Sequence, residues 1–406
     1  MPTILQISIE VNSGSVGRIA EQIGESVISN GWSSYITYAR NHNASKSKVI
    51  KIGNKIDIYR HGLETRIFDN HCFSSETATR DLVETIKRIN PDIIHLHHLH
   101  GYFINIGILF KYLKESCLPL VWTFHDCWSF TGHCAHFDFV GCEKWKTECY
   151  NCEQKNEYPA SFIFDRSRQN FQQKKRIFNS VDNLTIVPVS NWLYEKVKDS
   201  FLNEYPCKVI QNGIDLNVFY PRKSRDVIEN LYDVKGKWVI LGVASTWDKK
   251  KGLEDFFKLN DLIDKKQFVI ILVGLSPNQL QKLPKSIIGL QRTENVDQLA
   301  DLYSAADVFV NPTLEDTYPT TNMESISCGT PVISYNTGGS VESINKFTGL
   351  IVEKEDVIGL YSAISKIKNN GKMFYKNACI ENAKLHFNKN IKFIEYISLY
   401  KSLLKI

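Results

Sequence analysis

Acidic residues that follow a short apolar run are the first candidates for chemistry in this chain. Glu315 and Asp316 lie in the loop that follows the run 307–312, and Glu324 stands eight positions after Asp316, in a stretch predicted as a helix opened by Pro319. Carboxylates only accept hydrogen bonds and therefore suit the hydroxyl groups of a sugar and a ribose, while the free N–H groups of a helix N-terminus suit a phosphate. Taken alone, the segment is as compatible with a solvated acidic turn before an amphipathic helix as it is with a ligand-binding site.

Lysines occupy a similar position earlier in the same half of the chain. Lys250 and Lys251 follow the apolar run 238–244, and Gly252 opens a helix over 252–263. Because no Asp-x-Asp pair follows a strand in the manner of a metal-dependent site, lysines and helix N-termini would have to neutralise any phosphate group bound here. The alternative is that Lys250 and Lys251 belong to a run of ordinary surface lysines. The glycine at the start of the helix favours a phosphate-binding role instead.

Histidines and glycines follow the strands predicted in the first half. His125 comes directly after the buried run 119–124, and four more histidines lie within 95–101. Alternate side chains of a strand point to opposite faces, so we expect these four to pack or to line a site without binding a metal. Gly14 and Gly17 lie in the first strand-to-helix turn, where glycine serves either close packing or the approach of a phosphate or acceptor to the backbone.

A cysteine-rich loop spans residues 127–152. It contains a C-x7-C-x6-C-x2-C pattern, which offers enough thiolates for a structural zinc site. The alternative is a group of buried free thiols around Trp128 and Trp145, because a zinc ribbon would have two C-x2-C pairs and this loop has one. Both interpretations stand at this point, and the zinc ligands of the first would be Cys134, Cys142, Cys149 and Cys152.

The elements that must position these residues alternate in type along the chain. Apolar runs without a helical period predict buried strands, and apolar positions at helical spacing, such as Ile19, Ile23 and Val27, predict helices between them. The alternation restarts after a seam near 201–222 and ends in a basic amphipathic helix over 388–405. This α/β pattern is typical of two doubly wound parallel sheets, which bind ligands beyond the carboxyl ends of their strands.

Composition places the chain among ordinary folded proteins. Hydrophobic residues make up 43% and charged residues 23%, and the net charge is +5. This small excess of positive charge argues against a nucleic-acid partner. It is compatible with anionic substrates or with loose docking on an anionic membrane face. The N-terminus lacks a basic segment and a small-residue cleavage site, and no apolar stretch approaches the roughly 18 residues of a membrane helix. We therefore expect a cytoplasmic protein with reduced cysteines.

Several segments together resemble retaining family 4 glycosyltransferases of the GT-B fold, in the bacterial capsule and exopolysaccharide branch. Residues 311–332 (NPTLEDTYPTTNMESISCGTPV) are similar to the E-x7-E region of that family, with Asp316 and Glu324 in the acidic places. Further family motifs match in the same order along the chain. These are FHD (124–126), VIQNGIDLNVFYP (209–221), DKKKG (248–252) and GTPVISYNTGGSVE (329–342).

The resemblance covers nearly the whole chain and implies a fold and a set of site residues. It implies two Rossmann-like domains facing each other across a cleft: an acceptor-side domain at 1–205, a nucleotide-sugar-binding domain at 206–388, and a C-terminal helix, 389–406, returning to the first. Catalytic roles fall to His125, Lys251 and Asp316. The expected donor-binding residues are Gly14, Gly17, Lys250, Lys251, Arg292, Glu315, Asp316, Thr320 and Glu324.

Two departures from the family pattern affect these assignments. Ser245, Thr246 and Trp247 stand where the family has an arginine, so we take Lys250 as the substitute for the second phosphate contact. Aspartate replaces glutamate at the first acidic position, with Glu315 beside it.

The expected activity is transfer of a hexose-type sugar, with retention, from a nucleotide-sugar donor to a glycan. The expected acceptor is a lipid-linked oligosaccharide at the inner membrane face, with the protein cytoplasmic or in peripheral contact with that membrane. Catalysis would need no cofactor, and zinc would be structural. Two alternatives remain: a sugar-nucleotide epimerase or hydrolase of the same fold, and a zinc-dependent nucleic-acid-binding protein, which leaves Lys251, Asp316 and Glu324 unexplained.

Overall fold

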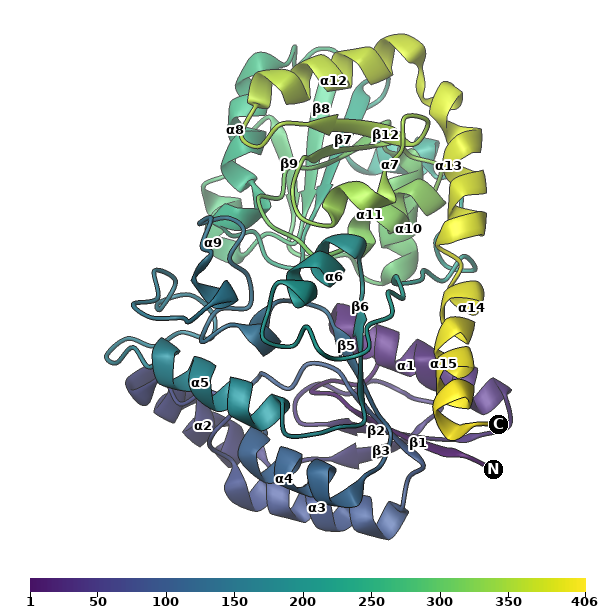
Figure 1. Cartoon of the computed structure of the whole chain (residues 1–406). Helices are drawn as coiled ribbons and strands as arrows, with labels where there is room; N and C mark the ends of the chain where they lie inside the picture. Colours follow the sequence, from purple (N-terminus) through teal and green to yellow (C-terminus); the bar gives the residue numbers. More distant parts are fainter. The chain divides into compact units, whose positions relative to one another are not determined.

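The computed structural model describes residues 1–406, which divide into two compact units (Figure 1). Unit 1 comprises Met1–Gln211 together with Lys392–Ile406, and unit 2 comprises Asn212–Ile391. Each unit contains one six-stranded sheet whose neighbouring strands run parallel. The chain therefore completes unit 2 before its last residues return to unit 1.

The sheet of unit 1 has the strand order β3-β2-β1-β4-β5-β6. Its strands are β1 (Thr3–Ile7), β2 (Ser33–Tyr38), β3 (Lys48–Lys51), β4 (Ile93–Leu96), β5 (Leu120–Phe124) and β6 (Leu184–Pro188). β5 is buried at every position, as expected of an apolar strand covered on both faces. The order reverses between β1 and β4, and this switch point is where a Rossmann sheet binds its ligand.

Helices connect these strands, and asparagine side chains cap two of them. Asn54 caps α2 and Asn105 caps α4, each accepting hydrogen bonds from N–H groups of the first turn. The helices of unit 1 are α1 (Gly14–Ser29), α2 (Lys55–Phe68), α3 (Glu76–Ile89), α4 (Ile106–Ser116), α5 (Ser167–Phe178) and α6 (Asn191–Lys198), with the 3₁₀ turns η1 (Trp128–Phe130) and η2 (Lys144–Lys146).

The C-terminal residues fold as two helices rather than one. The amphipathic helix expected over 388–405 is divided into α14 (Lys389–Lys392) and α15 (Ile394–Leu404). Tyr396 and Tyr400 of α15 pack in one core with Ile4 and Ile23. The Tyr400 hydroxyl also lies 2.6 Å from Nδ1 of His95 in β4. Apolar side chains at helical spacing thus bind the end of the chain to the sheet of unit 1.

Unit 2 repeats the same topology, with the strand order β12-β11-β10-β7-β8-β9 and a switch point between β7 and β10. Its strands are β7 (Trp238–Val243), β8 (Phe268–Val273), β9 (Ile287–Leu290), β10 (Val308–Asn311), β11 (Val332–Tyr335) and β12 (Gly349–Val352). Its helices are α7 (Arg225–Leu231), α8 (Leu253–Leu262), α9 (Pro277–Gln281), α10 (Val296–Ala305), α11 (Thr320–Ser327), α12 (Val357–Asn370) and α13 (Lys372–His386), with the 3₁₀ turns η3 (Lys249–Lys251) and η4 (Ser340–Ser343). None of the helices in either unit combines the length and the apolar character needed to cross a bilayer.

Candidate active site

Two lysines and two acidic residues meet at the switch point of unit 2. Lys250 and Lys251 lie in η3, which follows β7, and Glu315 and Asp316 lie in the loop after β10. Lys251 Nζ is 2.7 Å from Asp316 Oδ2, and Lys250 Nζ is 2.6 Å from Glu315 Oε1. Two cations and two anions therefore gather where an open parallel sheet binds its ligand.

The lysine turn is held against the acidic loop by backbone contacts that require a glycine. Gly252 has φ +73°, and a Cβ added there would lie 2.3 Å from the carbonyl oxygen of Pro312. The N–H of Leu314 donates to the carbonyl oxygen of Lys250 at 2.7 Å, and the Asp248 carboxylate accepts from two N–H groups of the turn. The backbone of the lysines is therefore fixed relative to β10.

A pair of glycines holds the acidic loop from its other side. A Cβ added at Gly338, which has φ +50°, would lie 2.0 Å from the carbonyl oxygen of Asp316. The N–H of Gly339 donates to that same oxygen at 3.0 Å, and the Thr337 hydroxyl donates to the carbonyl oxygen of Leu314 at 2.8 Å. The two glycines of the motif 329–342 therefore help to fix the backbone position of Asp316.

Lys251 keeps its positive charge at neutral pH. Burial opposes the charged form of this side chain, but the Coulomb attraction and the hydrogen bond of Asp316 outweigh burial and raise the pKa of Lys251 above its ordinary value. An anionic ligand at this turn would therefore meet an ammonium group whose present partner is a carboxylate.

Glu324, the second acidic residue of the sequence motif, is buried in the helix that follows the acidic loop. It lies in α11 with 4% of its surface exposed, and the Tyr303 hydroxyl of α10 donates to its Oε2 at 3.1 Å. Asn322 of α11 pairs with Asn311 at the end of β10 at 2.9 Å, which fixes the helix relative to the strand. A buried carboxylate that already accepts from one hydroxyl is the kind of group that binds a ribose.

The two remaining candidates of unit 2 are Thr320 and Arg292. Thr320 is the first residue of α11 and is half-buried. The sequence predicted that Pro319 would be the first helical residue, but Pro319 is the N-cap and precedes the helix. Arg292 is exposed in the segment between β9 and α10, and the structure does not join it to the four charged residues.

In unit 1, a chain of hydrogen bonds sets the tautomer of His125. The Gln6 amide nitrogen donates to the carbonyl oxygen of Ala20 at 2.9 Å, so its oxygen faces His97 Nε2, 2.9 Å away. His97 Nε2 then carries the proton, which leaves His97 Nδ1 to accept from His125 Nε2 at 3.2 Å. Burial holds the pKa of both imidazoles well below the ordinary value, so both are neutral. His125 Nδ1 is therefore an acceptor, suited to a sugar hydroxyl.

Asp126, the next residue, lies between two further histidines. His100 Nε2 is 2.7 Å and His98 Nε2 is 3.2 Å from Asp126 Oδ2, and the three ligand atoms lie within 4.8 Å of one another. Burial alone would raise the pKa of Asp126, but the attraction of the two histidines holds it well below its ordinary value. Of the four histidines of 95–101, only His95 lies in β4, where it contacts α15. His98 and His100 follow the end of the strand, so alternation along a strand accounts neither for their placement nor for the carboxylate of Asp126 that joins them.

The two glycines of the first turn are explained by packing. Gly14 is the first residue of α1, with φ +61°, and Gly17 is buried one turn later. An added Cβ would lie 2.8 Å from Glu10 Oε2 at Gly14 and 3.1 Å from the Glu10 carbonyl oxygen at Gly17. Both glycines make room for Glu10, and their part in donor binding stays a prediction.

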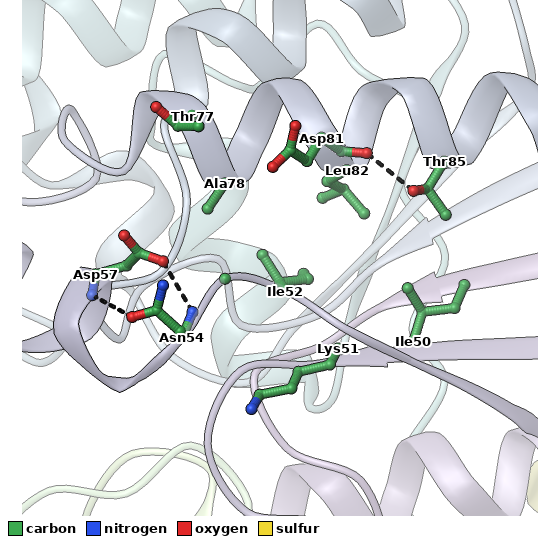
Figure 2. Close-up of a pocket in the computed structure, with 11 residues that line it drawn as sticks. Ile50, Lys51, Ile52, Asn54, Asp57, Thr77, Ala78, Asp81, Leu82 and Thr85 are labelled. Atoms are coloured by element: carbon green, nitrogen blue, oxygen red, sulfur yellow. Dashed lines mark hydrogen bonds between the residues drawn. The ribbon is translucent and has the colours of Figure 1, made fainter.

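A separate pocket of about 380 Å³ lies beyond β3, beside α2 and α3 (Figure 2). Its polar groups already serve the protein. Asn54 Oδ1 and Asp57 Oδ2 each accept from the other residue's backbone N–H, and the Thr85 hydroxyl donates to the carbonyl oxygen of Asp81. These bonds cap α2 and stabilise α3, so the two switch points are better candidates for the site than this pocket.

Comparison with known families covers both units. The model of a family described as Glycosyltransferase Family 4 matches residues 16–218, which is half of the chain. A second model, described as Glycosyl transferases group 1, matches residues 237–370.

Individual relatives extend over most or part of the chain. The "Putative colanic acid biosynthesis glycosyl transferase" of Escherichia coli K12 is 27% identical over 381 residues, covering 88% of this chain and 89% of that protein. The UDP-Gal:alpha-D-GlcNAc-diphosphoundecaprenol alpha-1,3-galactosyltransferase of Escherichia coli is 26% identical over 186 residues, covering 43% of this chain and 48% of that protein.

Solved structures confirm the predicted GT-B fold. Sucrose-phosphate synthase of Thermosynechococcus elongatus aligns with a TM-score of 0.72 at 18% identity, covering 100% of both chains. HepE of Anabaena in complex with UDP aligns with a TM-score of 0.68 at 12% identity, covering 99% of this chain and 100% of the other.

Proposed function

This chain belongs to glycosyltransferase family 4, and we propose that it transfers a hexose-type sugar from a nucleotide-sugar donor to a glycan with retention of configuration. The observation that supports this donor class best is the pairing of Lys251 with Asp316 and of Lys250 with Glu315 at the switch point of unit 2. The leaving group of such a donor is a nucleoside diphosphate, and its growing negative charge needs fixed cations.

The proposed reaction takes place on one face of the sugar. The bond from the sugar C1 to the diphosphate oxygen breaks with its electron pair leaving on that oxygen, and the acceptor oxygen bonds to C1 from the same side. The acceptor's proton passes to the departing phosphate oxygen. Lys251 exchanges its Asp316 partner for the diphosphate, so that the Asp316 carboxylate accepts from a sugar hydroxyl. The family resemblance also gives His125 a part in holding the sugar, and that role stays a prediction.

The donor assignment predicts a selective loss when Glu324 is changed to glutamine. The amide keeps the size of the side chain and its contact with Tyr303, but a ribose hydroxyl loses a charge-assisted bond of about 1.5–3 kcal/mol. Donor affinity should fall about tenfold or more, with kcat nearly unchanged, because a ribose contact is the same in the ground and transition states.

A thermal-shift screen with UDP, GDP, dTDP and ADP sugars measures this effect. For the wild type, the matching donor at a hundred times its Kd should add about 2.7 kcal/mol of stability. Exposed Glu355, changed to glutamine, is the matched control. Donor affinity that is the same in the Glu324 and Glu355 variants would contradict the ribose role.

The acceptor proposal is a lipid-linked oligosaccharide in polysaccharide biosynthesis. The relative that spans most of the chain is named for colanic acid biosynthesis, and the galactosyltransferase is named for an undecaprenol-linked acceptor. Such an acceptor is anchored in a membrane, so the enzyme would have to work at the membrane surface.

A patch of exposed apolar side chains on unit 1 supports that location. Ile56, Tyr59 and Leu63, along one face of α2, are 76%, 77% and 59% exposed. Segment 162–164 lies beside the end of α2, since the Phe162 N–H donates to the carbonyl oxygen of Arg66 at 2.8 Å. Together the exposed apolar residues are Ile56, Tyr59, Leu63, Phe68, Phe162, Ile163 and Phe164. We call this set the α2 patch; Lys55 and Arg66 flank it, and Arg60 pairs with Glu64 at 2.8 Å.

The α2 patch predicts binding to anionic vesicles. Changing Tyr59 and Phe164 together to serine should lower the membrane partition constant by about 100-fold or more, because each aromatic ring loses about 1.5–3 kcal/mol of burial in the lipid boundary. Co-sedimentation with vesicles containing anionic phospholipid measures this. Ile358, an exposed apolar residue of unit 2, changed to serine is the matched control. Equal binding by the wild type and both variants would contradict the prediction that the α2 patch contacts the membrane.

A further inference from the structure

The segment between η1 and α5 is long, and its one short element is η2. A loop of this length inside a compact unit needs a cross-link or a function of its own. Four cysteines of the segment line one cavity of about 20 Å³: Cys134, Cys142, Cys149 and Cys152. That volume accommodates one ion or one water molecule.

We propose that the thiolates of these four cysteines bind one zinc ion, which stabilises segment 131–166 against the sheet of unit 1. The assignment is independent of glycosyl transfer, because zinc with four sulfur ligands has no open position for a substrate. The other walls of the cavity include Phe137 and Trp145, which are both buried and stack on each other at 4.6 Å between ring centroids. The ion would therefore lie in a site that largely excludes water.

Backbone contacts fix the cysteines from both ends of the segment. The Gly132 N–H donates to Cys149 Sγ at 3.2 Å, a bond of the type that supports metal-bound thiolates. A Cβ at Gly132 would lie 2.1 Å from the carbonyl oxygen of Ser167, so this close approach requires glycine. Asp165 accepts from the Cys152 N–H at 2.6 Å and from the Ser167 N–H at 2.8 Å. The C-x2-C pair is thereby tied to the start of α5.

His133 belongs to the wall of the cavity and is oriented by a carboxylate. It lines the cavity, and its Nδ1 lies 2.7 Å from Asp69 Oδ1. Its Nε2 is buried and lies close to the backbone of Glu157. A histidine oriented by a carboxylate is a common neighbour or ligand of zinc. Because four thiolates complete a tetrahedral shell, the proposal leaves His133 outside it.

A buried lysine supplies a compensating charge. A zinc ion with four thiolates carries a net charge of about −2, which is costly to bury without a cation. Lys174 of α5 is 1% exposed and donates to the carbonyl oxygens of Trp128 and Thr131 at 2.8 and 3.1 Å. Burial lowers the pKa of Lys174 to about 7, and negative charge at Cys149 and Cys134 favours its protonated form.

Binding requires the four sulfur atoms to move closer together. The ligand atoms found within 4.8 Å of one another belong to His98, His100 and Asp126, and not to these cysteines. Neutral thiols have no reason to gather as tightly as thiolates around a cation, whose Zn–S distances are about 2.3 Å.

X-ray absorption of the full-length wild-type protein, purified without a tag under reducing conditions, tests the proposal directly. We expect about one zinc per chain and a first shell of four sulfur atoms at about 2.3 Å. Protein from zinc-replete medium that carries less than about 0.1 zinc per chain would overturn the proposal. A first shell of nitrogen and oxygen would assign the metal to His98, His100 and Asp126 instead and would equally overturn it.

Single serine variants identify the ligands. Each of the Cys134, Cys142, Cys149 and Cys152 variants should retain less than about a fifth of the wild-type zinc. Cys207→Ser, at a cysteine of the same unit with similar burial, should keep it all. Full zinc content in any of the four variants overturns the four-sulfur site, as does zinc that persists in Cys142→Ser and leaves with His133→Gln.

Discussion

Replacing Lys251 with alanine is expected to lower kcat by about 10²- to 10³-fold, or about 3–4 kcal/mol of transition-state stabilisation. Negative charge grows on the diphosphate as the sugar leaves, and Lys251 is a fixed cation at the start of a helix. The alanine variant also leaves Asp316 without its ion-pair partner at 2.7 Å, an anion that would repel the leaving group. Both effects act in the same direction.

Steady-state kinetics with the matching donor measures this loss. Lys265→Ala, which removes an exposed lysine from the same unit, is the control and should keep wild-type turnover. Because the pKa of Lys251 is raised, the lysine stays protonated as pH rises through neutrality, so wild-type activity should not fall between pH 7 and 9 through this group. Addition of EDTA should leave the rate nearly intact. A variant with normal turnover, or a wild type that stops on removal of Mg²⁺, would refute this account of the leaving group.

Changing Asp316 to asparagine should separate kcat from nucleotide affinity. The neutral amide loses a charge-assisted bond to the sugar hydroxyl, about 1.5–3 kcal/mol, so kcat should fall about 10- to 100-fold. Product affinity should not weaken, because Lys251 no longer has a carboxylate that competes with the diphosphate. A single isosteric change would thus slow the reaction while leaving nucleoside diphosphate binding equal or tighter.

Titration calorimetry with the nucleoside diphosphate, beside kinetics, tests that separation. The double variant Lys251→Ala/Asp316→Asn should be far less impaired than the product of the single losses, since paired residues act as one unit. Parallel loss of turnover and of product affinity in Asp316→Asn would instead give the carboxylate a structural role only.

The sequence was informative where a residue's neighbours along the chain determine its place. Lys251 and Asp316 each follow a buried apolar strand and precede a helix, and the parallel sheet brings those strand ends together. Buried strands such as β5 and β8 are continuous apolar runs and were recognisable for that reason. The edge strand β3, Lys48–Lys51, is largely exposed and lacks such a run.

Contacts between residues distant in sequence could not be predicted in the same way. The tautomer of His125 depends on Gln6, which lies 91 residues before His97. His98 and His100 were visible as a motif, but their carboxylate partner Asp126 belongs to another strand end. The pairing of Lys250 with Glu315 likewise depends on backbone contacts at Gly252 that no pattern of residue types reveals.

The most direct test of the central claim is a stoichiometric assay of donor and acceptor. The wild-type protein is incubated with the matching nucleotide sugar, with and without a polyprenyl-diphosphate-linked saccharide, and NMR follows the anomeric signals. We predict that nucleoside diphosphate is released only when the acceptor is present, in a one-to-one ratio with a new glycoside of the donor's anomeric configuration. Donor hydrolysis or isomerisation at the same rate without the acceptor, or a product of inverted configuration, would contradict the account.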